Sequence, residues 1–489
     1  MALLIFGINE NAHNASLSVV RDGEILFSAE AERFTKIKND PHMSRDLILH
    51  AIDLFGGPDS VAYYEDRRLK KKRLKKYGGR EYGHAGAYKN IHKSLTFAKE
   101  VSYGHHESHA AAGFLTSPFS TATVVVVDAI GEFDTASIWL GNGAKIKKLL
   151  SIKYPVSFGL FYSWFTSACG LEAGKDEYIL MGMAAYGDPC RFYKDVDALF
   201  PSVYEQARNF HMSGTISDIG IDVANQSDLF DVAAAVQVVF EARIIELVKL
   251  SIGITKCNNL VLMGGCALNC VANYKIRQLV DQLWILPNPG DGGSSLGAAA
   301  LLSGQRVNWR GPYLGVQIHG EYPIQEALSS IASDGAVAIA NGRAEFGPRA
   351  LGNRSILADP RMDKQKLEIN KLKKREQFRP FAPVVPAEYA NNWFDIDYES
   401  PYMQMTVPCK RPDLIPAVVH VDGTSRVQTV RKDQHPGLHS LLLAWGEMSG
   451  IPVLLNTSLN VKNEPLVNSE DDALRWAREN KNIKLLLRS

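Results

Sequence analysis

The chain has 489 residues, which is too long for one ordinary hydrophobic core and predicts two or three domains. Its 54 lysines and arginines nearly balance 53 aspartates and glutamates, so no global field favours a nucleic-acid polymer or an anionic membrane. No apolar run reaches the roughly 18 residues of a membrane span, and the N-terminal residues lack a basic leader, so we expect a cytoplasmic protein.

Two similar strand patterns begin the two halves of the first predicted domain. Residues 3–8 are apolar and are followed by residues 15–20 and 25–29, which flank an Asp-Gly turn typical of a β-hairpin. The β-branched run at 123–128 and the strand at 136–140 repeat that arrangement. Such a repeat is typical of the duplicated ATPase core of the actin/hexokinase type, in which two related α/β lobes face each other across a phosphate-binding cleft.

A change of composition predicts where the first domain ends. Residues 231–250 are apolar at every third or fourth position and predict a helix, whereas residues 304–315 are polar and show no periodicity. We therefore predict one domain over residues 1–308 and a second α/β domain over residues 309–489. The second domain is predicted to hold strands at 336–340 and 453–455 and helices at 363–373 and 471–479.

Two histidines and two aspartates form a candidate metal site. His105 and His109 are four residues apart on a predicted helix, so their side chains project from the same side. A histidine pair at this spacing is more often structural, and the prediction therefore depends on carboxylates that join it. Asp128 ends an apolar strand and Asp291 precedes a helix rich in small residues, which are positions where functional groups collect. Fe(II), Mn or Zn would suit this ligand set, and the ligand types do not choose among them.

Glycine-rich turns in the same domain predict a phosphate site, because exposed backbone N–H groups beside a helix N-terminus attract anions. The residues are Gly264, Gly265 and Asn269 after one apolar strand, and Gly292 and Gly293 before the small-residue helix. Ordinary tight turns are the alternative reading of each glycine pair.

The second domain is dense in cations that stand beside Gly and Pro, where a guanidinium is held rigidly enough for bidentate phosphate recognition. Structural ion pairing is the alternative for any one of them. The candidate residues are Arg349, Arg354, Lys373, Arg375 and Arg426, together with Ser458 and Asn460 in a polar loop after an apolar strand.

Long motifs in fixed order make the chain similar to a known family. They are HNAS (13–16), HHESHAAAGF (105–114), GGCALN (264–269), PGDGGSSLGAA (289–299), EFGPRALGNRSILADPR (345–361), KKREQFRPFAPVV (373–385) and PVLLNTSLN (452–460). From about residue 5 to residue 475 the chain resembles the Nod-factor and cephem-type (NodU/CmcH-like) O-carbamoyltransferases.

This resemblance implies a Kae1-like domain of the duplicated ATPase fold followed by a YrdC-like domain. Carbamoyl phosphate and ATP, with Mg, would give carbamoyl adenylate in the second domain, and the first would move the carbamoyl group to a hydroxyl of a small acceptor. By the same resemblance His13 is the acceptor-activating base, and Asn14 stands where relatives commonly have Asp. The four candidate metal ligands and the seven cationic and polar residues of the second domain match the family's positions, with Fe(II) favoured. Family acceptors range over sugars, antibiotics and nucleosides, so we expect the acceptor here to be a nucleotide, a sugar or an antibiotic. Whether the chain forms a homodimer is left open.

Two rival functions use similar parts. One is a tRNA threonylcarbamoyl-adenosine modification enzyme, against which the near-zero net charge and the PRALGNRS motif speak. The other is a nucleotide-binding ATPase without transfer activity, which would need neither the metal ligands nor His13.

A basic run at residues 67–76 carries eight cations in ten residues. A solvated helix or loop is its ordinary reading. Because the run lies between His13 and the histidine pair in the sequence, it also predicts a site for an acceptor phosphate. The candidate residues are Lys70, Lys71, Lys72 and Arg73.

Overall fold

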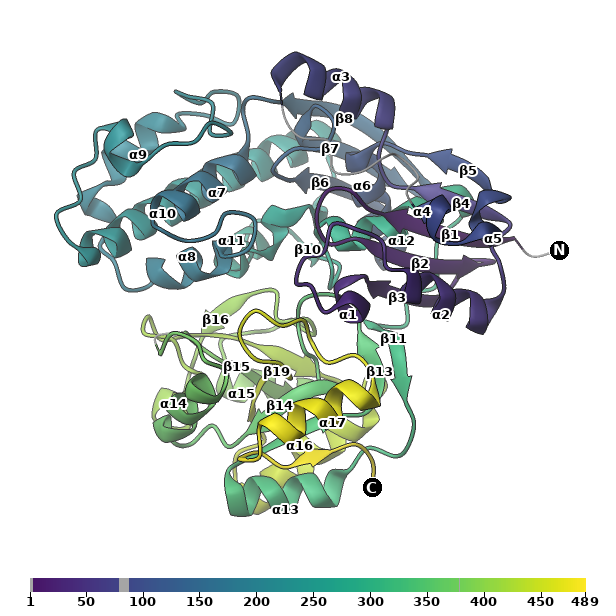
Figure 1. Cartoon of the computed structure of the whole chain (residues 1–489). Helices are drawn as coiled ribbons and strands as arrows, with labels where there is room; N and C mark the ends of the chain where they lie inside the picture. Colours follow the sequence, from purple (N-terminus) through teal and green to yellow (C-terminus); the bar gives the residue numbers. More distant parts are fainter. Residues whose placement is uncertain (1–2, 79–87, 378) are drawn as a thin grey trace. The chain divides into compact units, whose positions relative to one another are not determined.

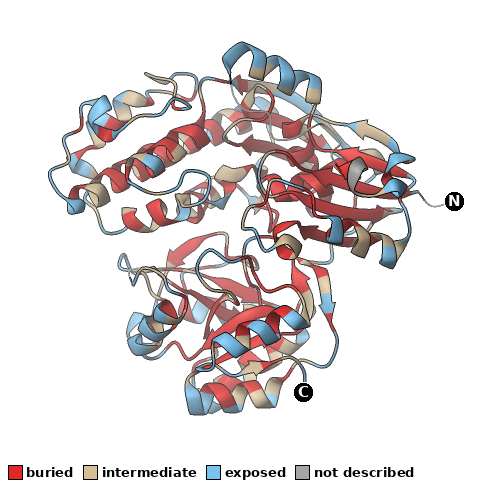
Figure 2. Cartoon of the chain, in the orientation of Figure 1, coloured by how far each residue is buried: buried red, intermediate tan, exposed pale blue. Residues whose placement is uncertain are grey.

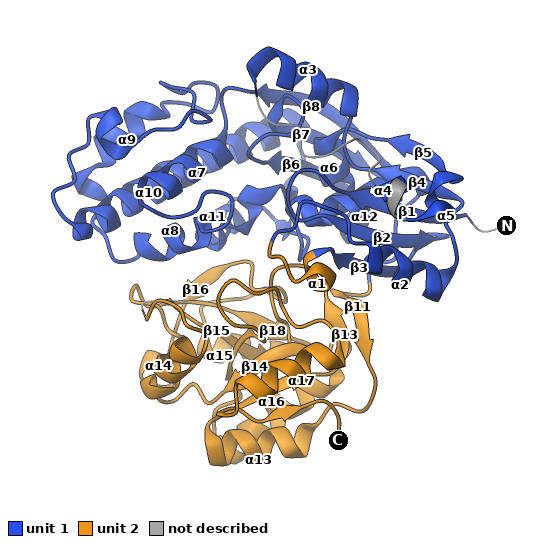
Figure 3. Ribbon diagram, viewed as in Figure 1, with its two compact units in different colours: residues 1–31, 39–309 blue, residues 32–38, 310–489 orange. Residues whose placement is uncertain are grey.

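The computed structural model describes residues 3–78, 88–377 and 379–489 (Figure 1). The chain divides into two units, one of residues 1–31 and 39–309 and one of residues 32–38 and 310–489 (Figure 3). The short segment 32–38 contains helix α1 (Glu32–Thr35), whose buried Arg33 donates a hydrogen bond to the Gly347 carbonyl at 2.7 Å. No feature of the sequence predicted that this segment packs with residues from beyond 309.

The first sheet of unit 1 has the strand order β3-β2-β1-β4-β5. Strand β1 is antiparallel to β2 and parallel to β4. Asp22 and Gly23 both have positive φ, as the two central residues of a tight hairpin turn require. The strands are β1 (Leu4–Asn9), β2 (Ser16–Arg21), β3 (Glu24–Glu30), β4 (Ser60–Tyr63) and β5 (Lys99–Ser102).

The second sheet of unit 1 repeats the first, with order β10-β9-β6-β7-β8. Its first strand, β6, is again antiparallel to the next strand in sequence, β7, and parallel to the fourth, β9. The strands are β6 (Thr121–Val127), β7 (Asp134–Asn142), β8 (Lys145–Lys153), β9 (Asn259–Met263) and β10 (Gln282–Trp284). The repeated topology confirms the duplicated α/β core of the actin/hexokinase type.

Two helices lie together beside these sheets, α6 (His105–Thr116) and α12 (Asp291–Ser303). A Cβ on Gly297 of α12 would lie 1.8 Å from the Ser108 carbonyl oxygen of α6, so only glycine permits this approach. Other helices of the unit are α2 (Arg45–Phe55), α3 (Arg67–Tyr77), α4 (Tyr88–Ile91), α5 (Lys93–Thr96), α7 (Phe158–Ala168), α8 (Glu177–Ala184), α9 (Tyr193–Leu199), α10 (Gln226–Thr255) and α11 (Cys270–Arg277). Every helix in the described ranges is too short or too polar to cross a bilayer.

Unit 2 is built on a six-stranded mixed sheet of order β18-β15-β19-β14-β12-β20. The buried Trp445 and its neighbours fill one face of the sheet, and buried residues occupy the interior of both units (Figure 2). Its strands are β11 (Tyr313–Ile318), β12 (Ala336–Ala340), β13 (Gly342–Glu345), β14 (Arg354–Ala358), β15 (Ala382–Pro386), β16 (Thr406–Pro408), β17 (Thr424–Arg426), β18 (Gln428–Val430), β19 (Leu454–Ser458) and β20 (Leu485–Leu486). Its helices are α13 (Ile324–Asp334), α14 (Asp363–Leu372), α15 (Ala390–Trp393), α16 (Pro436–Ser449) and α17 (Glu470–Glu479).

Candidate functional site

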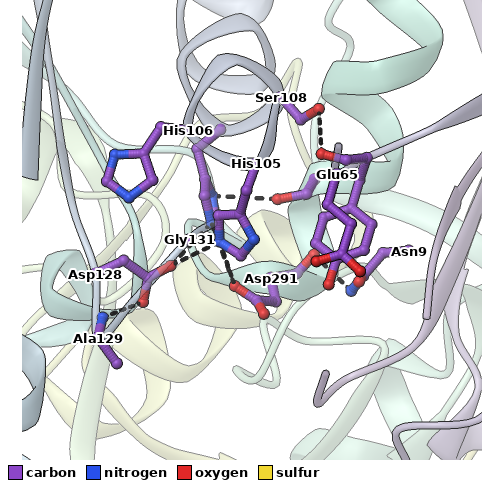
Figure 4. A network of polar contacts seen from close by, with 12 residues as sticks. Asn9, Glu65, His105, His106, Ser108, Asp128, Ala129, Gly131 and Asp291 are labelled. Carbon is purple, nitrogen blue, oxygen red and sulfur yellow. Dashed lines mark hydrogen bonds and ion pairs between the residues drawn. The ribbon is translucent and has the colours of Figure 1, made fainter. Parts of the chain in front are cut away.

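Four buried side chains of unit 1 meet at one point (Figure 4). His105 and His109 come from the first turns of α6, Asp128 follows β6, and Asp291 is the first residue of α12. The Nε2 atom of His109 lies 3.1 Å from Asp128 Oδ2 and 3.2 Å from Asp291 Oδ1. The structure therefore brings together the two histidines and two aspartates that the sequence singled out, and we call them the His/Asp cluster.

The spacing of the His/Asp cluster fits a metal ion. A ligand atom of each residue lies within 4.8 Å of the others, and the two Nε2 atoms are 3.1 Å apart. Ligands about 2.1 Å from an ion stand about 3.0 Å apart in octahedral and about 3.4 Å apart in tetrahedral geometry. The distances from His105 Nε2 to Asp128 Oδ2 (3.2 Å) and to Asp291 Oδ1 (3.4 Å) fall in this range. Imidazole and carboxylate together suit Fe(II), Mn or Zn.

Neighbouring groups fix the cluster side chains. The backbone N–H of Ala129 donates to Asp128 Oδ1 at 2.7 Å, and Ser294 Oγ lies 3.3 Å from His109 Nδ1. His106, inside the same motif, turns away and pairs with Ser137 Oγ at 2.8 Å. Burial lowers the pKa of His106 well below its ordinary value, so this imidazole is neutral and packs in the core.

His13 lies at the exposed edge of the cluster. Its side chain is 51% exposed, and its Nε2 atom is 3.5 Å from Asp291 Oδ2. Its Nδ1 atom is 2.9 Å from Oδ1 of Asn14, which has a positive φ of 54°. The Asp291 carboxylate raises the pKa of His13 above its ordinary value. The ring is thus positioned to exchange a proton with a group that approaches the cluster from solvent.

The predicted glycine turns pack closely around the same cluster. A Cβ on Gly264, whose φ is +91°, would lie 2.2 Å from the Val127 carbonyl oxygen, and one on Gly292 would lie 2.5 Å from Glu30 Oε1. A Cβ on Gly265 would lie 3.2 Å from Asp128 Oδ1, and one on Gly293 would lie 1.9 Å from the Asn288 carbonyl oxygen. Asn269 accepts a hydrogen bond from the Ala272 N–H and so caps α11. Phosphate binding by these residues stays a prediction.

In unit 2 the predicted residues Lys373, Ser458 and Asn460 lie in contact. The Lys373 ammonium donates to Asn460 Oδ1 at 2.7 Å and to Ser458 Oγ at 3.1 Å. Burial lowers the pKa of Lys373 well below its ordinary value, and the nearby Arg375 lowers it further. The Arg375 guanidinium lies over the Phe381 ring at 4.1 Å from its centroid. Such a cation-rich corner can accept an anion, whose charge would restore the protonated form of Lys373.

Arg354 does not fit its predicted role as a phosphate ligand. Its side chain is fully buried, and its guanidinium donates to the carbonyl oxygens of Asn341, Gly342, Val316, Asn353 and Asn468. These bonds occupy all five N–H groups of an arginine and leave none for a phosphate. Arg354 therefore holds these backbone segments together. Arg349 lies half-buried in the turn between β13 and β14, and Arg426 lies half-buried at the end of β17.

The basic run forms helix α3, which Asp66 caps at its N-terminus. Two of its cations contact neighbouring loops of the same unit. Lys70 Nζ donates to the Asn11 carbonyl at 3.0 Å, and Arg73 donates to the Gly131 carbonyl at 3.3 Å. Lys71 and Lys72 are exposed. Asn11 belongs to the loop that carries His13, so α3 rests against the loops around the cluster.

Sequence reasoning missed three polar residues next to the cluster. Glu132 accepts hydrogen bonds from the N–H groups of Asp66 (2.7 Å) and His105 (2.9 Å), and so holds the starts of α3 and α6 together. Asn9 Nδ2 donates to the Asp291 carbonyl at 2.8 Å. Glu65 is buried and pairs with Lys70 at 2.7 Å. The one signal in the sequence was their position, because each follows an apolar strand or turn.

The chain is similar to proteins of one family over most of its length. Residues 62–300 match the model described as carbamoyltransferase N-terminus, and residues 328–488 match the one described as carbamoyltransferase C-terminus. Nodulation protein NolNO of Sinorhizobium fredii is 32% identical, over 95% of this chain and 77% of that protein. The 3′-hydroxymethylcephem-O-carbamoyltransferase of Amycolatopsis lactamdurans is 28% identical, over 95% and 94%. The solved structure of full-length HypF in its phosphate- and nucleotide-bound form covers 62% of this chain and 46% of its own, with 14% identity and a TM-score of 0.34.

With two family models matched in order and a relative that is 32% identical over 95% of this chain, the chain belongs to the carbamoyltransferase family.

Proposed function

We propose that the chain is an ATP-dependent O-carbamoyltransferase that uses carbamoyl phosphate and acts on a hydroxyl of a small molecule. The observation that carries this proposal is the half-exposed His13 at 3.5 Å from Asp291 of the buried His/Asp cluster. A proton acceptor beside a metal site suits attack by an alcohol on a carbonyl carbon, because it can take the hydroxyl proton while the ion polarises the carbonyl. The relative named as a cephem O-carbamoyltransferase, which matches 95% of this chain, supports the reaction class.

Donor activation is assigned to unit 2, which we interpret as the YrdC-like domain. Water releases carbamate and phosphate from carbamoyl phosphate, and a carbamate oxygen then attacks the α-phosphorus of Mg-bound ATP. The bond to the β-phosphate oxygen breaks, so carbamoyl adenylate and pyrophosphate are the products. Lys373 and Arg375 would hold the transferring phosphates, with Ser458 and Asn460 fixing the ammonium of Lys373.

Carbamoyl transfer is assigned to unit 1, which we interpret as the Kae1-like domain. His13 takes the proton of the acceptor hydroxyl as its oxygen attacks the carbamoyl carbon, and AMP leaves with the bonding electrons. His105, His109, Asp128 and Asp291 would hold the metal ion, for which we propose Fe(II). A bound divalent ion supplies Lewis-acid polarisation of a carbonyl or phosphoryl oxygen. The glycine turns at Gly264 and Gly292 are the proposed phosphate contacts of this unit.

The acceptor is proposed to carry phosphate. Lys70 of α3 contacts the loop that holds His13, and Arg73 contacts the loop that follows Asp128. Lys71 and Lys72 are exposed on the same helix. Helix α3 contains no acidic residue, and Glu65, which precedes it, pairs with Lys70. A phosphorylated alcohol such as a nucleotide would therefore gain attraction at this helix, whereas a neutral sugar or antibiotic would not.

Pyrophosphate exchange tests the reaction class. The protein is incubated with ATP and radiolabelled pyrophosphate, with and without carbamoyl phosphate, and label in ATP is counted. We expect exchange that depends on carbamoyl phosphate. Exchange without it, or exchange that requires threonine and bicarbonate, would contradict the proposal and favour an ATPase or a threonylcarbamoyl-forming enzyme.

A further inference from the structure

Two polar atoms beside the His/Asp cluster have no hydrogen-bond partner in the described part of the chain. They are Oδ1 of Asn9 and the hydroxyl of Tyr64. Both side chains are 0% exposed. A buried acceptor and a buried donor that remain unpaired destabilise a fold, and such atoms often mark the place of a bound group.

The fold places both residues at the same edge of the first sheet. Strands β1 and β4 are parallel neighbours, Asn9 ends β1, and Tyr64 follows β4 with its N–H donating to the Ile8 carbonyl at 3.1 Å. In α/β proteins ligands bind at the carboxyl ends of parallel strands. Asn9 and Tyr64 are therefore neighbours at the edge where the reaction is proposed.

Contacts with the cluster fix their orientation. Asn9, which lies beside Asp291 in Figure 4, donates from Nδ2 to the Asp291 carbonyl and to the Asn14 carbonyl, both at 2.8 Å. These two bonds assign the amide nitrogen, so Oδ1 is the atom left without a partner in the described part of the chain. The Tyr64 ring lies 5.2 Å, centroid to centroid, from the ring of the cluster residue His105. One acceptor and one donor are thus held next to the cluster and the His13 loop.

We infer that Asn9 and Tyr64 recognise the carbamoyl group itself. The Tyr64 hydroxyl would donate to the carbamoyl oxygen, and the carbamoyl NH2 would donate to Asn9 Oδ1. A carbamoyl group offers this acceptor and donor side by side, whereas an acetyl group of the same shape lacks the donor. Donation from Tyr64 would also favour the charge that develops on the oxygen during attack. This inference rests on the proposed carbamoyl transfer in unit 1.

The test uses the full chain loaded with one equivalent of Co²⁺, whose visible absorption reports on the ligands that hold it. Carbamoylsulfamoyl adenosine and acetylsulfamoyl adenosine, stable analogues of the two acyl adenylates, are titrated into the wild type, Tyr64→Phe and Tyr63→Phe. Tyr63 is the matched control, because its hydroxyl already donates to the Glu10 carbonyl at 3.1 Å. Thermal unfolding of each metal-free variant is measured alongside.

We expect the wild type to bind the carbamoyl analogue at least about tenfold more tightly than the acetyl analogue, the value of one hydrogen bond. Tyr64→Phe should lose about tenfold in affinity for the carbamoyl analogue yet unfold at the same or a higher temperature than the wild type. Tyr63→Phe should bind the carbamoyl analogue as tightly as the wild type but unfold at a lower temperature.

Equal affinity of the wild type for both analogues, or unchanged binding by Tyr64→Phe, would overturn the inference and leave a buried water as the partner of both atoms. Failure of the wild type to take up Co²⁺, or uptake with no spectral response to either analogue, would instead contradict the proposed transfer site.

Discussion

His109 and Asp128 place Nε2 and Oδ2 3.1 Å apart in the interior of unit 1, although one lies on a helix and the other follows a strand. Because both side chains are buried, a change in either one leaves the rest of the cluster without compensation by solvent.

Asp128→Asn should therefore abolish stoichiometric metal binding and reduce carbamoyl transfer at least about a hundredfold, while pyrophosphate exchange in unit 2 continues. Metal content is read by plasma mass spectrometry and exchange by the label in ATP. The division of labour between the units would be wrong if a folded, metal-depleted Asp128→Asn protein lost both activities.

Arg375→Ala should lower the rate of pyrophosphate exchange by about 10- to 100-fold, the contribution of a charge-assisted phosphate contact. Chemically supplied carbamoyl adenylate should restore transfer in this variant. Lys371→Ala, at an exposed position near the end of α14, is the control and should exchange as the wild type does. Rescue that fails would mean that unit 2 also takes part in the transfer.

Arg354→Lys should destabilise unit 2 by at least about 3 kcal/mol, because several buried carbonyls lose their donor. Thermal unfolding by calorimetry measures the loss. The KM for carbamoyl phosphate should stay unchanged in the folded protein at low temperature. A raised KM with unchanged stability would show that this arginine binds substrate after all.

Changing Lys71 and Lys72 to Ser should raise the KM for a phosphorylated acceptor several-fold at low salt, with little effect on kcat. The effect should fade as salt rises, since the screening length falls to about 10 Å at 0.1 M ionic strength. Lys194 and Lys249, which are also exposed in unit 1, provide the control pair. If a neutral acceptor has a higher kcat/KM than its phosphorylated form, α3 is a solvent-exposed helix that does not bind the acceptor.

His435 should make unit 2 sensitive to acid. Burial lowers the pKa of His435 to about 4. Its Nδ1 accepts the Leu438 N–H at the start of α16, and its Nε2 lies 2.8 Å from Asn353 Oδ1. The unfolded chain binds this proton near pH 6.5, so stability should fall as pH drops from about 6.5 to 4, by up to about 3 kcal/mol. His435→Asn keeps a side-chain cap and should flatten the pH dependence of the unfolding temperature over that interval. An unchanged slope would rule out His435 as its source.

Much of the fold could be predicted from the sequence because strand periodicity and turn chemistry are local. Residues 336–340 were predicted as a strand and form β12, and residues 363–373 were predicted as a helix and form α14 over 363–372. The predicted helix at 231–250 lies inside the longer α10. Local patterns could not reveal how Asn9 and Tyr64 face the cluster, since that depends on the pairing of β1 with β4 across the chain.

The candidate site was predictable in part for a similar reason. The four residues of the His/Asp cluster share a ligand chemistry that can be recognised by residue type, and they do meet. Arg354 was misjudged because a guanidinium that binds backbone carbonyls looks, in sequence, the same as one that binds phosphate. Burial is the property that separates these uses, and a single sequence does not reveal the burial of a polar residue.

The membership of residues 32–38 in unit 2 has a consequence for synthesis and folding. Arg33 and its partner Gly347 are 314 residues apart in the chain, and Lys36 and its partner Asp472 are 436 apart. On the ribosome this segment emerges before residues 39–309, whereas its partners are made after them. Unit 1 can complete its sheets during translation, whereas unit 2 must close a loop of several hundred residues, which is entropically costly and slow. A fragment that begins at Arg310 would also lack these contacts, so unit 2 is discontinuous in the gene although compact in space.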